Sequence, residues 1–261
     1  VNRMLGLTFD LLGANGYMGP HVVQALAAEH RLRITDIHPP PDEIKRAYGD
    51  HEFRNVDVTD QDQVARAAEG MEAIVNLAVV RRDPVLAFRV NTLGCYHVMR
   101  AAVQHGIRRV INTGPHFTVA GPTYEGVDFG IPPDVPPHPG TGLYPLSKSL
   151  GHEIGRIWSE AHDIYVQEYL FYSLQETDQL TLGAGGVPFV VSWRDAAEAF
   201  RLGLAIELKN LPSRFEVFFI LGDAPQGQFR NDKAKRILGF RPRDEVDLLW
   251  RRAAKDERRK P

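Results

Sequence analysis

The amino-acid sequence predicts an α/β protein built on a doubly wound parallel sheet, and three observations support this fold. Apolar stretches rich in strand formers alternate along the chain with stretches of helical periodicity. Residues 73–80 are apolar without alternation, which is typical of a parallel strand covered on both faces. A glycine-rich turn, Gly13-x-x-Gly16-x-x-Gly19, joins the first predicted strand to the first predicted helix.

The composition is that of an ordinary globular protein. The chain has 261 residues, of which 43% are hydrophobic and 25% are charged. This length allows one large α/β domain, or one domain with a small appendage. The formal net charge of −2 argues against nucleic acid or an anionic membrane as the main partner. The basic residues that begin with Arg251 and Arg252 are interpreted as a solvated tail.

Cysteine usage and hydropathy indicate the compartment. A single cysteine, Cys95, excludes an internal disulfide bond and a cysteine-rich zinc site, and it suits a reducing cytosol. We find no apolar run long enough to span a bilayer and no charged-then-apolar signal peptide. The ten histidines show no ligand spacing beside acidic residues, so we expect no metal site. These patterns predict a soluble cytoplasmic protein.

The predicted elements follow one another as strands and helices over the first two thirds of the chain. Residues 5–12 read as a strand, and residues 20–28 as a helix with apolar side chains on one side. Thr59 and Asp60 cap the helix predicted at 61–68, and Gly106 ends the helix predicted at 84–105. Further strands are predicted at 31–37, 53–58, 73–80, 109–113 and 165–171. The proline-rich segment 131–139 is interpreted as a loop folded over the functional site.

The glycine turn has the context of a dinucleotide-binding fingerprint, because it follows a strand and opens a helix. Such a turn must be tight, must let the backbone approach a pyrophosphate, and must allow close packing of helix on strand. The phosphates would then lie at the helix N-terminus, where free N–H groups favour anions. A simple glycine-rich loop is the alternative interpretation.

An acidic residue follows at the spacing that such a turn requires. Asp36 ends the second predicted strand, about 20 positions beyond the glycines, and can accept hydrogen bonds from the adenosine ribose. Its charge would repel a 2′-phosphate, so NAD is favoured over NADP. Alternatively, Asp36 is a turn residue before Pro39. Asp57 and Val58 end the third predicted strand, where an adenine would rest.

Tyr144 and Lys148 place a phenol and an ammonium one helical turn apart. Positions i and i+4 share a face of a helix. A neighbouring cation favours the phenolate, so we expect Lys148 to lower the pKa of Tyr144 from its usual value of about 10. Such a tyrosine can exchange a proton with an alcohol oxygen near neutral pH. The pattern also arises by chance in amphipathic helices with an exposed lysine.

These motifs occur in the order and spacing of a known family. The chain resembles an extended short-chain dehydrogenase/reductase of the NAD-dependent epimerase/dehydratase group over nearly its whole length. Besides the glycine turn, Asp36 and the Tyr144–Lys148 pair, the resemblance rests on Asp57-Val58 and Asn76-Leu77-Ala78. Residues 189–197 and 234–242 resemble the family's strand with capped helix and its closing helix. Among relatives, the chain looks most similar to uronate dehydrogenases.

The resemblance implies catalytic roles and exposes one departure. Tyr144 would be the general acid/base, Lys148 would hold the nicotinamide ribose, and a serine or threonine would bind the reacting oxygen. Uronate dehydrogenases carry Ser-Asn-His after the fifth strand, where this chain has Gly114-Pro115-His116. Counting back from Gly121 instead places His116 at the family's usual serine position, in a segment without any serine. We therefore name His116 as the third catalytic candidate, with Thr113 or Thr118 as a possible source of the hydroxyl. A loop histidine bonded to backbone is the alternative for His116.

The motifs and the resemblance together predict NAD as the cofactor. The expected cofactor-binding residues are Gly13, Asn15, Gly16, Tyr17, Met18, Gly19, Asp36, Asp57, Val58, Leu77, Ala78, Val79, Asn91, Thr113, Tyr144 and Lys148.

The substrate side is less well specified by the sequence. We expect substrate contacts from the segment after the sixth strand, which is acidic and contains no arginine. Arg194 is the nearest candidate for pairing with a carboxylate, because arginine offers a planar bidentate fork. Arg81 and Arg82 are other candidates, and each could be a surface arginine. The predicted substrate-binding residues are His116, Thr118, Tyr172, Ser173 and Arg194.

The sequence thus predicts a Rossmann core over residues 1–171 and a small substrate-capping part over residues 172–261, interwoven with the core. The expected function is NAD-dependent oxidation or reduction of a hydroxyl or carbonyl group on a sugar or sugar acid. The alternatives are an epimerase or dehydratase that retains its NAD, and an NAD-binding sensor that has lost its chemistry. The resemblance also implies a homodimer formed through the helices at 84–105 and 144–162.

Overall fold

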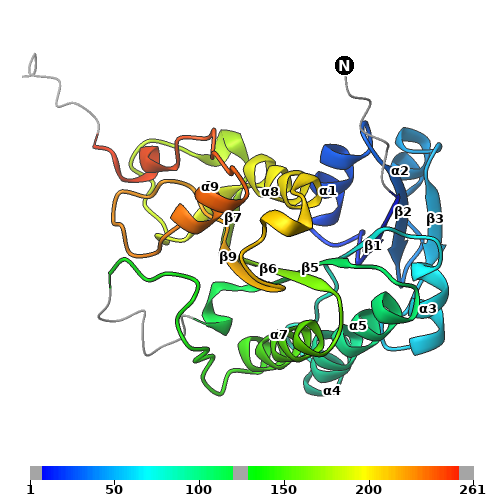
Figure 1. Cartoon of the computed structure of the whole chain (residues 1–261). Coiled ribbons are helices and arrows are strands. Elements are labelled where there is room, and N and C mark those ends of the chain that lie inside the picture. The colour runs from blue at the N-terminus through cyan, green and yellow to red at the C-terminus, as the bar shows by residue number, and fades with distance from the viewer. Residues whose placement is uncertain (1–7, 120–128, 253–261) are drawn as a thin grey trace, which may run out of the picture.

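Seven parallel strands form the central sheet of the computed structural model, which describes residues 8–119 and 129–252 (Figure 1). Their order is β3-β2-β1-β4-β5-β6-β9, and every neighbouring pair is parallel. The strands are β1 (Thr8–Leu12), β2 (Arg31–Asp36), β3 (Glu52–Asn55), β4 (Ala73–Asn76), β5 (Arg109–Pro115), β6 (Tyr165–Phe171) and β9 (Phe215–Phe219). The predicted doubly wound parallel sheet is confirmed.

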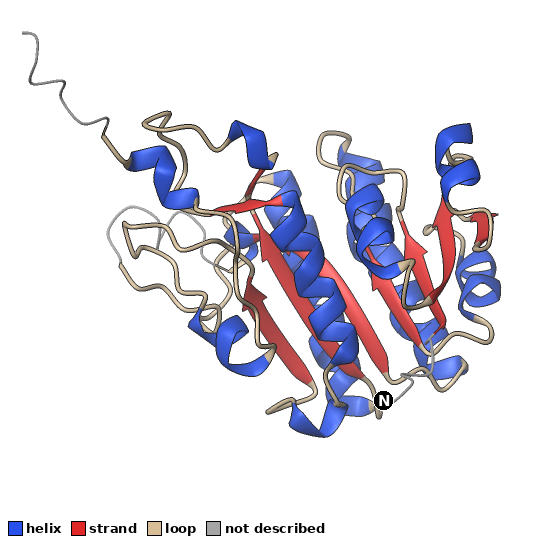
Figure 2. Cartoon of the chain, turned by 90° about the horizontal axis from the view of Figure 1, so that it is seen from above, coloured by secondary structure: helices blue, strands red, loops and turns tan. Residues whose placement is uncertain are grey.

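Helices cover both faces of this sheet. On one face lie α1 (Gly19–Leu26), α8 (Trp193–Ala205) and α9 (Asp232–Ile237), and on the other lie α3 (Gln61–Ala68), α4 (Pro84–Ala87), α5 (Gly94–Gln104) and α7 (Leu143–Ala161) (Figure 1). Seen from above, α1 and α8 lie side by side over the sheet (Figure 2). The short helix α2 (Asp42–Ala47), which the sequence analysis did not predict, joins β2 to β3.

Each face of the sheet has its own apolar core. One core joins Val22 and Leu26 of α1 to Phe200 of α8 and to the sheet. The other joins Val64 of α3 and Val98 of α5 to the opposite face. Full burial of such a side chain contributes about 1.5–3 kcal/mol. The two-sided burial explains why residues 73–80, which include β4, read as an apolar run without alternation.

The strand order reverses between β1 and β4. The chain runs from β1 outward to β3, and then returns to β4 on the other side of β1. In an open α/β sheet, the carboxyl ends of the strands leave a crevice at such a reversal, because successive loops turn away in opposite directions. The glycine turn lies directly at this point, after β1.

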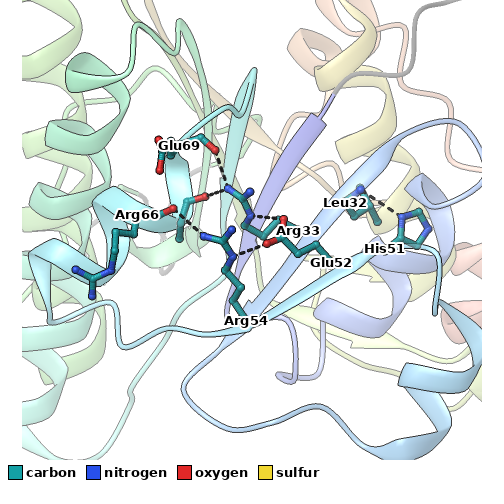
Figure 3. Close-up of polar contacts among 8 residues, drawn as sticks. Leu32, Arg33, His51, Glu52, Arg54, Arg66 and Glu69 are labelled. Carbon is teal, nitrogen blue, oxygen red and sulfur yellow. Dashed lines mark hydrogen bonds and ion pairs between the residues drawn. The ribbon is translucent and has the colours of Figure 1, made fainter.

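A buried arginine anchors the β3 edge of the sheet (Figure 3). Arg33 on β2 donates a hydrogen bond of 2.8 Å to Glu52 on β3, and it donates to the backbone oxygens of Ala67 and Glu69 at the end of α3. Arg54 donates to the same carboxylate. Because Asp36 lies farther along β2, this cluster fixes the strand that carries it.

The helix predicted at 84–105 forms, with a change of geometry in its middle. It begins as α4, widens into the π-helical segment η1 (Phe88–Leu93) and continues as α5, and Gly106 follows its end with φ +67°. Asn91 lies in η1, and π segments inside α-helices often occur at functional sites.

The last third of the chain is interwoven with the core. A small two-stranded sheet pairs β7 (Ser173–Gln175) with β8 (Val190–Ser192), and Ser192 caps α8. The chain then returns to the central sheet as β9, which the sequence analysis did not predict. The 3-10 helices η2 (His116–Thr118), η3 (Thr177–Gln179), η4 (Leu208–Asn210) and η5 (Val246–Trp250) complete the described elements. The proposed boundary at residues 171 and 172 stays a prediction.

Candidate active site

A cavity of about 620 Å³ opens at the carboxyl ends of the central strands, and we call it the main cavity. It is bounded by the glycine turn, by the loops after β4, β5 and β6, and by the first turns of α7. Its lining residues are Gly13, Gly16, Tyr17, Met18, Leu77, Val79, Arg81, Thr113, Gly114, Pro115, Phe117, Tyr144, Lys148, Phe171, Tyr172, Leu174 and Trp193.

The structure brings Tyr144 and Lys148 together in this cavity. Both lie on α7, which begins after the extended residue Gly142, and their spacing places them on one face. Lys148 is buried, and its Nζ donates a hydrogen bond of 2.9 Å to the backbone oxygen of Ala78. Burial lowers the pKa of Lys148 to about 8.

The electrostatic environment of Tyr144 differs from the sequence prediction. Burial raises the pKa of Tyr144, and the charge and hydrogen bonding of Arg81 oppose that rise. The guanidinium carbon of Arg81 lies 5.4 Å from the centroid of the Tyr144 ring. The expectation that Lys148 lowers this pKa below 10 is therefore wrong for the protein without ligands. Arg81 is the cation that acts on the phenol.

The glycine turn is shaped by close backbone contacts. Gly13 has φ +80°, and a Cβ there would lie 2.8 Å from the backbone nitrogen of Ala78. A side chain at Gly19, the first residue of α1, would collide with the backbone of Ala14. These positions admit only glycine without a local shift, so the turn stays close to the loop after β4 and to α1.

Asp36 is oriented by backbone donors next to the turn. Its carboxylate accepts hydrogen bonds from the N–H of Asn15 at 3.0 Å and from the N–H of His38 at 3.1 Å. It lines a second cavity of about 450 Å³, together with Asp57, Val58 and Ala78. The two cavities share Gly13, Gly16, Leu77 and Val79, so they meet at the glycine turn. An elongated ligand could lie across both.

Gly114 is the residue at which the resemblance to uronate dehydrogenases leads us to expect serine, and the structure shows a steric obstacle to a side chain there. A Cβ on Gly114 would lie 2.5 Å from Cε1 and 2.6 Å from Nε2 of His152. His152 follows Lys148 by one more helical turn on the same face of α7. Its ring therefore fills the space that a serine side chain would need.

His152 belongs to a buried polar group beneath Lys148. Its Nε2 lies 3.1 Å from Oε2 of Glu168 on β6, and the other carboxyl oxygen, Oε1, accepts a hydrogen bond from Asn112 at 3.1 Å. Burial raises the pKa of Glu168 to about 8 and lowers the pKa of His152 to about 3. Burial therefore disfavours the charged form of each side chain.

His116 and Thr118 do not reach the main cavity. His116 is 2% exposed, and its ring stacks on Phe189 with a centroid separation of 4.6 Å. Burial lowers its pKa to about 3, so the imidazole is neutral. The Thr118 hydroxyl donates to the backbone oxygen of Pro115. In this conformation both residues support the wall behind Phe117, which itself lines the cavity.

The other predicted residues are divided between the cavities and the protein interior. Tyr172 lines the main cavity, and Thr113 does so while donating to the backbone oxygen of Asn76. Arg194 forms an ion pair with Asp244 beside a separate hollow. Ser173 accepts a hydrogen bond from the side chain of its neighbour Gln175, and neither cavity includes it.

Asn91 is held inside the protein by three hydrogen bonds. Its side chain accepts from the N–H of Val80 and donates to the backbone oxygen of Val80 and to the hydroxyl of Ser147. It thereby ties the loop after β4 to α7.

Two cavity residues, Phe117 and Trp193, were not predicted from the sequence, because aromatic residues are usually interpreted as packing residues.

Within the part of the chain that the structure describes, no cluster of three potential metal ligands occurs, and no helix is long and apolar enough to cross a membrane.

Comparisons with known proteins agree with this geometry. Residues 11–168 match the model of the NAD dependent epimerase/dehydratase family. The NAD-dependent glucose-6-phosphate dehydrogenase of Haloferax volcanii is 26% identical over 251 residues, covering 90% of this chain and 92% of its own. A uronate dehydrogenase of Pseudomonas syringae pv. tomato is 32% identical over 170 residues, covering 62% of this chain and 56% of its own.

Solved structures show the same fold. A mutant of uronate dehydrogenase from Agrobacterium tumefaciens, complexed with NAD, superposes with a TM-score of 0.74 over 93% of this chain and 87% of its own at 19% identity. Glucuronic acid dehydrogenase from Chromohalobacter salexigens also gives a TM-score of 0.74 at 20% identity, over 93% and 86%.

The residues present fit NAD. The glycine turn leaves room for a pyrophosphate at α1, and Asp36 offers its carboxylate to a ribose in the second cavity. Tyr144 and Lys148 lie in the main cavity, where the nicotinamide half would extend.

Proposed function

The chain belongs to the NAD dependent epimerase/dehydratase family, and on that basis we propose that it oxidises or reduces a hydroxyl or carbonyl group of a sugar or sugar acid with NAD. The observation that carries this proposal is the main cavity, because it contains both Tyr144 and Lys148 and adjoins the glycine turn. A protein that only senses NAD would need neither side chain.

The chemistry divides between the protein and its cofactor. When bound in this site, NAD would supply the hydride-transfer chemistry at the substrate carbon. In the oxidative direction, the phenolate of Tyr144 takes the proton of the substrate hydroxyl as the carbonyl forms. Lys148, whose Nζ donates to the backbone oxygen of Ala78, would orient the nicotinamide ribose. In the reductive direction, the same phenol returns the proton.

The charge of the main cavity favours an acidic sugar. Its described lining includes the cations Arg81 and Lys148 and no carboxylate. A uronate or a sugar phosphate would find attractive charge there, whereas a cationic substrate would be repelled. The names of the relatives, which include uronate and glucose-6-phosphate dehydrogenases, support this range of substrates.

The test is NADH formation by the purified protein with NAD and a panel of uronates, sugar phosphates, neutral aldoses and polyols. We expect turnover with an acidic sugar, and loss of turnover in Tyr144→Phe with NAD binding retained. Tight NAD binding without turnover on the whole panel would instead favour an epimerase that recycles its NAD, or a sensor. Stereochemical inversion of a nucleotide sugar would identify the epimerase.

We also propose that the protein is a cytoplasmic homodimer. Leu93 on η1, Tyr96 on α5 and Ile157 on α7 are 43%, 36% and 49% exposed, and they lie on the helices expected at the interface. Sedimentation at micromolar concentration should give a dimer. Ile157→Arg should give a monomer, and Leu182→Arg, a change at a 52% exposed leucine in a distant loop, should not. A monomeric parent protein would refute the proposal.

A further inference from the structure

Arg81 lines the main cavity but is not part of the family motifs on which the resemblance rests. It follows β4 in a loop, and its guanidinium lies over the ring of Tyr144 with the guanidinium carbon 5.4 Å from the centroid. Arg81 lines the cavity, whereas its neighbour Arg82 does not. In residues 8–119 and 129–252, no carboxylate forms an ion pair with Arg81.

The same cavity lacks the usual donor to the reacting oxygen. Gly114 has no side chain, and His152 blocks the space where one would project. Pro115 follows and has no N–H to donate. The hydroxyl of Thr113 donates to the backbone of Asn76, and His116 is packed behind Phe117. On the β5 side, the described chain therefore leaves no evident donor for a substrate oxygen at Tyr144.

Arg81 can supply that donor from the loop after β4. A guanidinium has five N–H groups in a rigid fork, so it can hold the phenol oxygen and a substrate oxygen at once. Its charge is permanent, whereas the pKa of Lys148 is lowered to about 8 by burial and the Lys148 Nζ already donates to Ala78. Filling of the cavity by ligands would exclude water from Arg81 and strengthen its effect.

We propose that Arg81 is a catalytic residue of this protein, which holds the reacting oxygen beside Tyr144 and stabilises the phenolate in place of the absent serine. The proposal rests on the proposed oxidoreductase function for the substrate oxygen, but its effect on Tyr144 is independent of any substrate. The titratable and charged side chains that line the main cavity with Tyr144 are Tyr17, Arg81, Lys148 and Tyr172.

The first experiment measures the pKa of Tyr144 without substrate. The phenolate absorbance is titrated in the full-length protein, and the titration of the matching Tyr144→Phe variant is subtracted to remove the other seven of the eight tyrosines. Arg81→Gln removes the charge, Arg81→Lys retains it, and Arg82→Gln is the matched control in the same exposed loop. Circular dichroism confirms that each variant is folded.

We expect Arg81→Gln to raise the pKa of Tyr144 by about one unit, the low end of the effect of a nearby charge, because Arg81 is exposed to solvent. Arg81→Lys and Arg82→Gln should leave it close to the parent value. Lys148→Met should raise it by less than Arg81→Gln does. An unchanged value in Arg81→Gln, or a larger shift in Lys148→Met, overturns the proposal.

The second experiment uses the substrate that the panel identifies. Arg81→Gln should lower kcat about tenfold below the pKa of Tyr144 and move the pH profile to higher pH, with partial recovery in Arg81→Lys. If Arg81 only recognised a distant carboxylate, Arg81→Gln would raise KM for the acidic sugar alone and leave the pH profile in place, and the proposal would be refuted. Failure of the whole panel would count against the proposed function, while the titration would still decide the role of Arg81.

Discussion

Gly114 offers a direct test of why the chain lacks serine at this position. Gly114→Ser adds a Cβ that would lie 2.5 Å from Cε1 of His152, whereas ordinary van der Waals contact begins near 3.4 Å. The imidazole would have to retreat by about 0.9 Å, the difference between these distances. His152 has little room to do so, because it is 7% exposed and its Nε2 lies 3.1 Å from Glu168.

The expected cost of Gly114→Ser follows from overpacking of a rigid interior. Such insertions destabilise a protein by about 1–3 kcal/mol. For a chain of this size, each kcal/mol lowers Tm by roughly 2–4 °C. Gly114→Ala should cost about the same, because the clash arises from the Cβ and not from the hydroxyl.

The assay is a double-mutant cycle by urea unfolding with Gly114→Ser, His152→Ala and the double variant. Removing the imidazole gives the new side chain space, so the double variant should be more stable than the sum of the single changes predicts. We expect a coupling of roughly 0.5–3 kcal/mol, as for residues in contact. Additive changes would show that His152 does not block this position, and the steric account of the missing serine would then be rejected.

Three further predictions concern the buried acid and the cofactor. Burial raises the pKa of Glu168 to about 8, so between about pH 4.5 and pH 8 this carboxyl keeps a proton in the folded state that it loses in the unfolded state. Between about pH 6.5 and pH 8, where the buried His116 and His152 are neutral in both the folded and the unfolded state, stability should therefore fall as pH rises. Glu168→Gln should flatten that fall, and an equally steep fall in the variant would contradict the prediction. Asp36→Ser should raise the affinity for NADP relative to NAD, measured by calorimetry, because the carboxylate that repels a 2′-phosphate is lost. Gly13→Ala should weaken NAD binding at least tenfold in the same assay, since a Cβ at φ +80° would lie 2.8 Å from the nitrogen of Ala78. The control is Gly70→Ala, which also places alanine at a positive φ, +76°, but has open space around it and lies outside the turn. Equal affinity in both glycine variants would show that the close contact between residue 13 and Ala78 does not limit NAD binding.

Much of the fold could be predicted because its signals are local. A parallel strand buried on both faces gives an apolar run without alternation, so β4 could be found from the run at residues 73–80. Asp60 was expected to cap α3, and its carboxylate accepts from the N–H groups of Asp62 and Gln63. By contrast, β9 was missed, because its place at the sheet edge beside β6 depends on a partner about 50 residues away in the chain.

The sequence by itself determined the glycine turn, the acidic residue after β2 and the Tyr144–Lys148 spacing, because each depends on a few neighbouring residues. Only the tertiary structure decided which side chains meet Tyr144. It buried His116 among aromatic rings, engaged Lys148 with Ala78 and brought Arg81 over the phenol. The physical reason is that burial and charge–charge distance set the pKa of an active-site group, and both are fixed by residues distant in sequence.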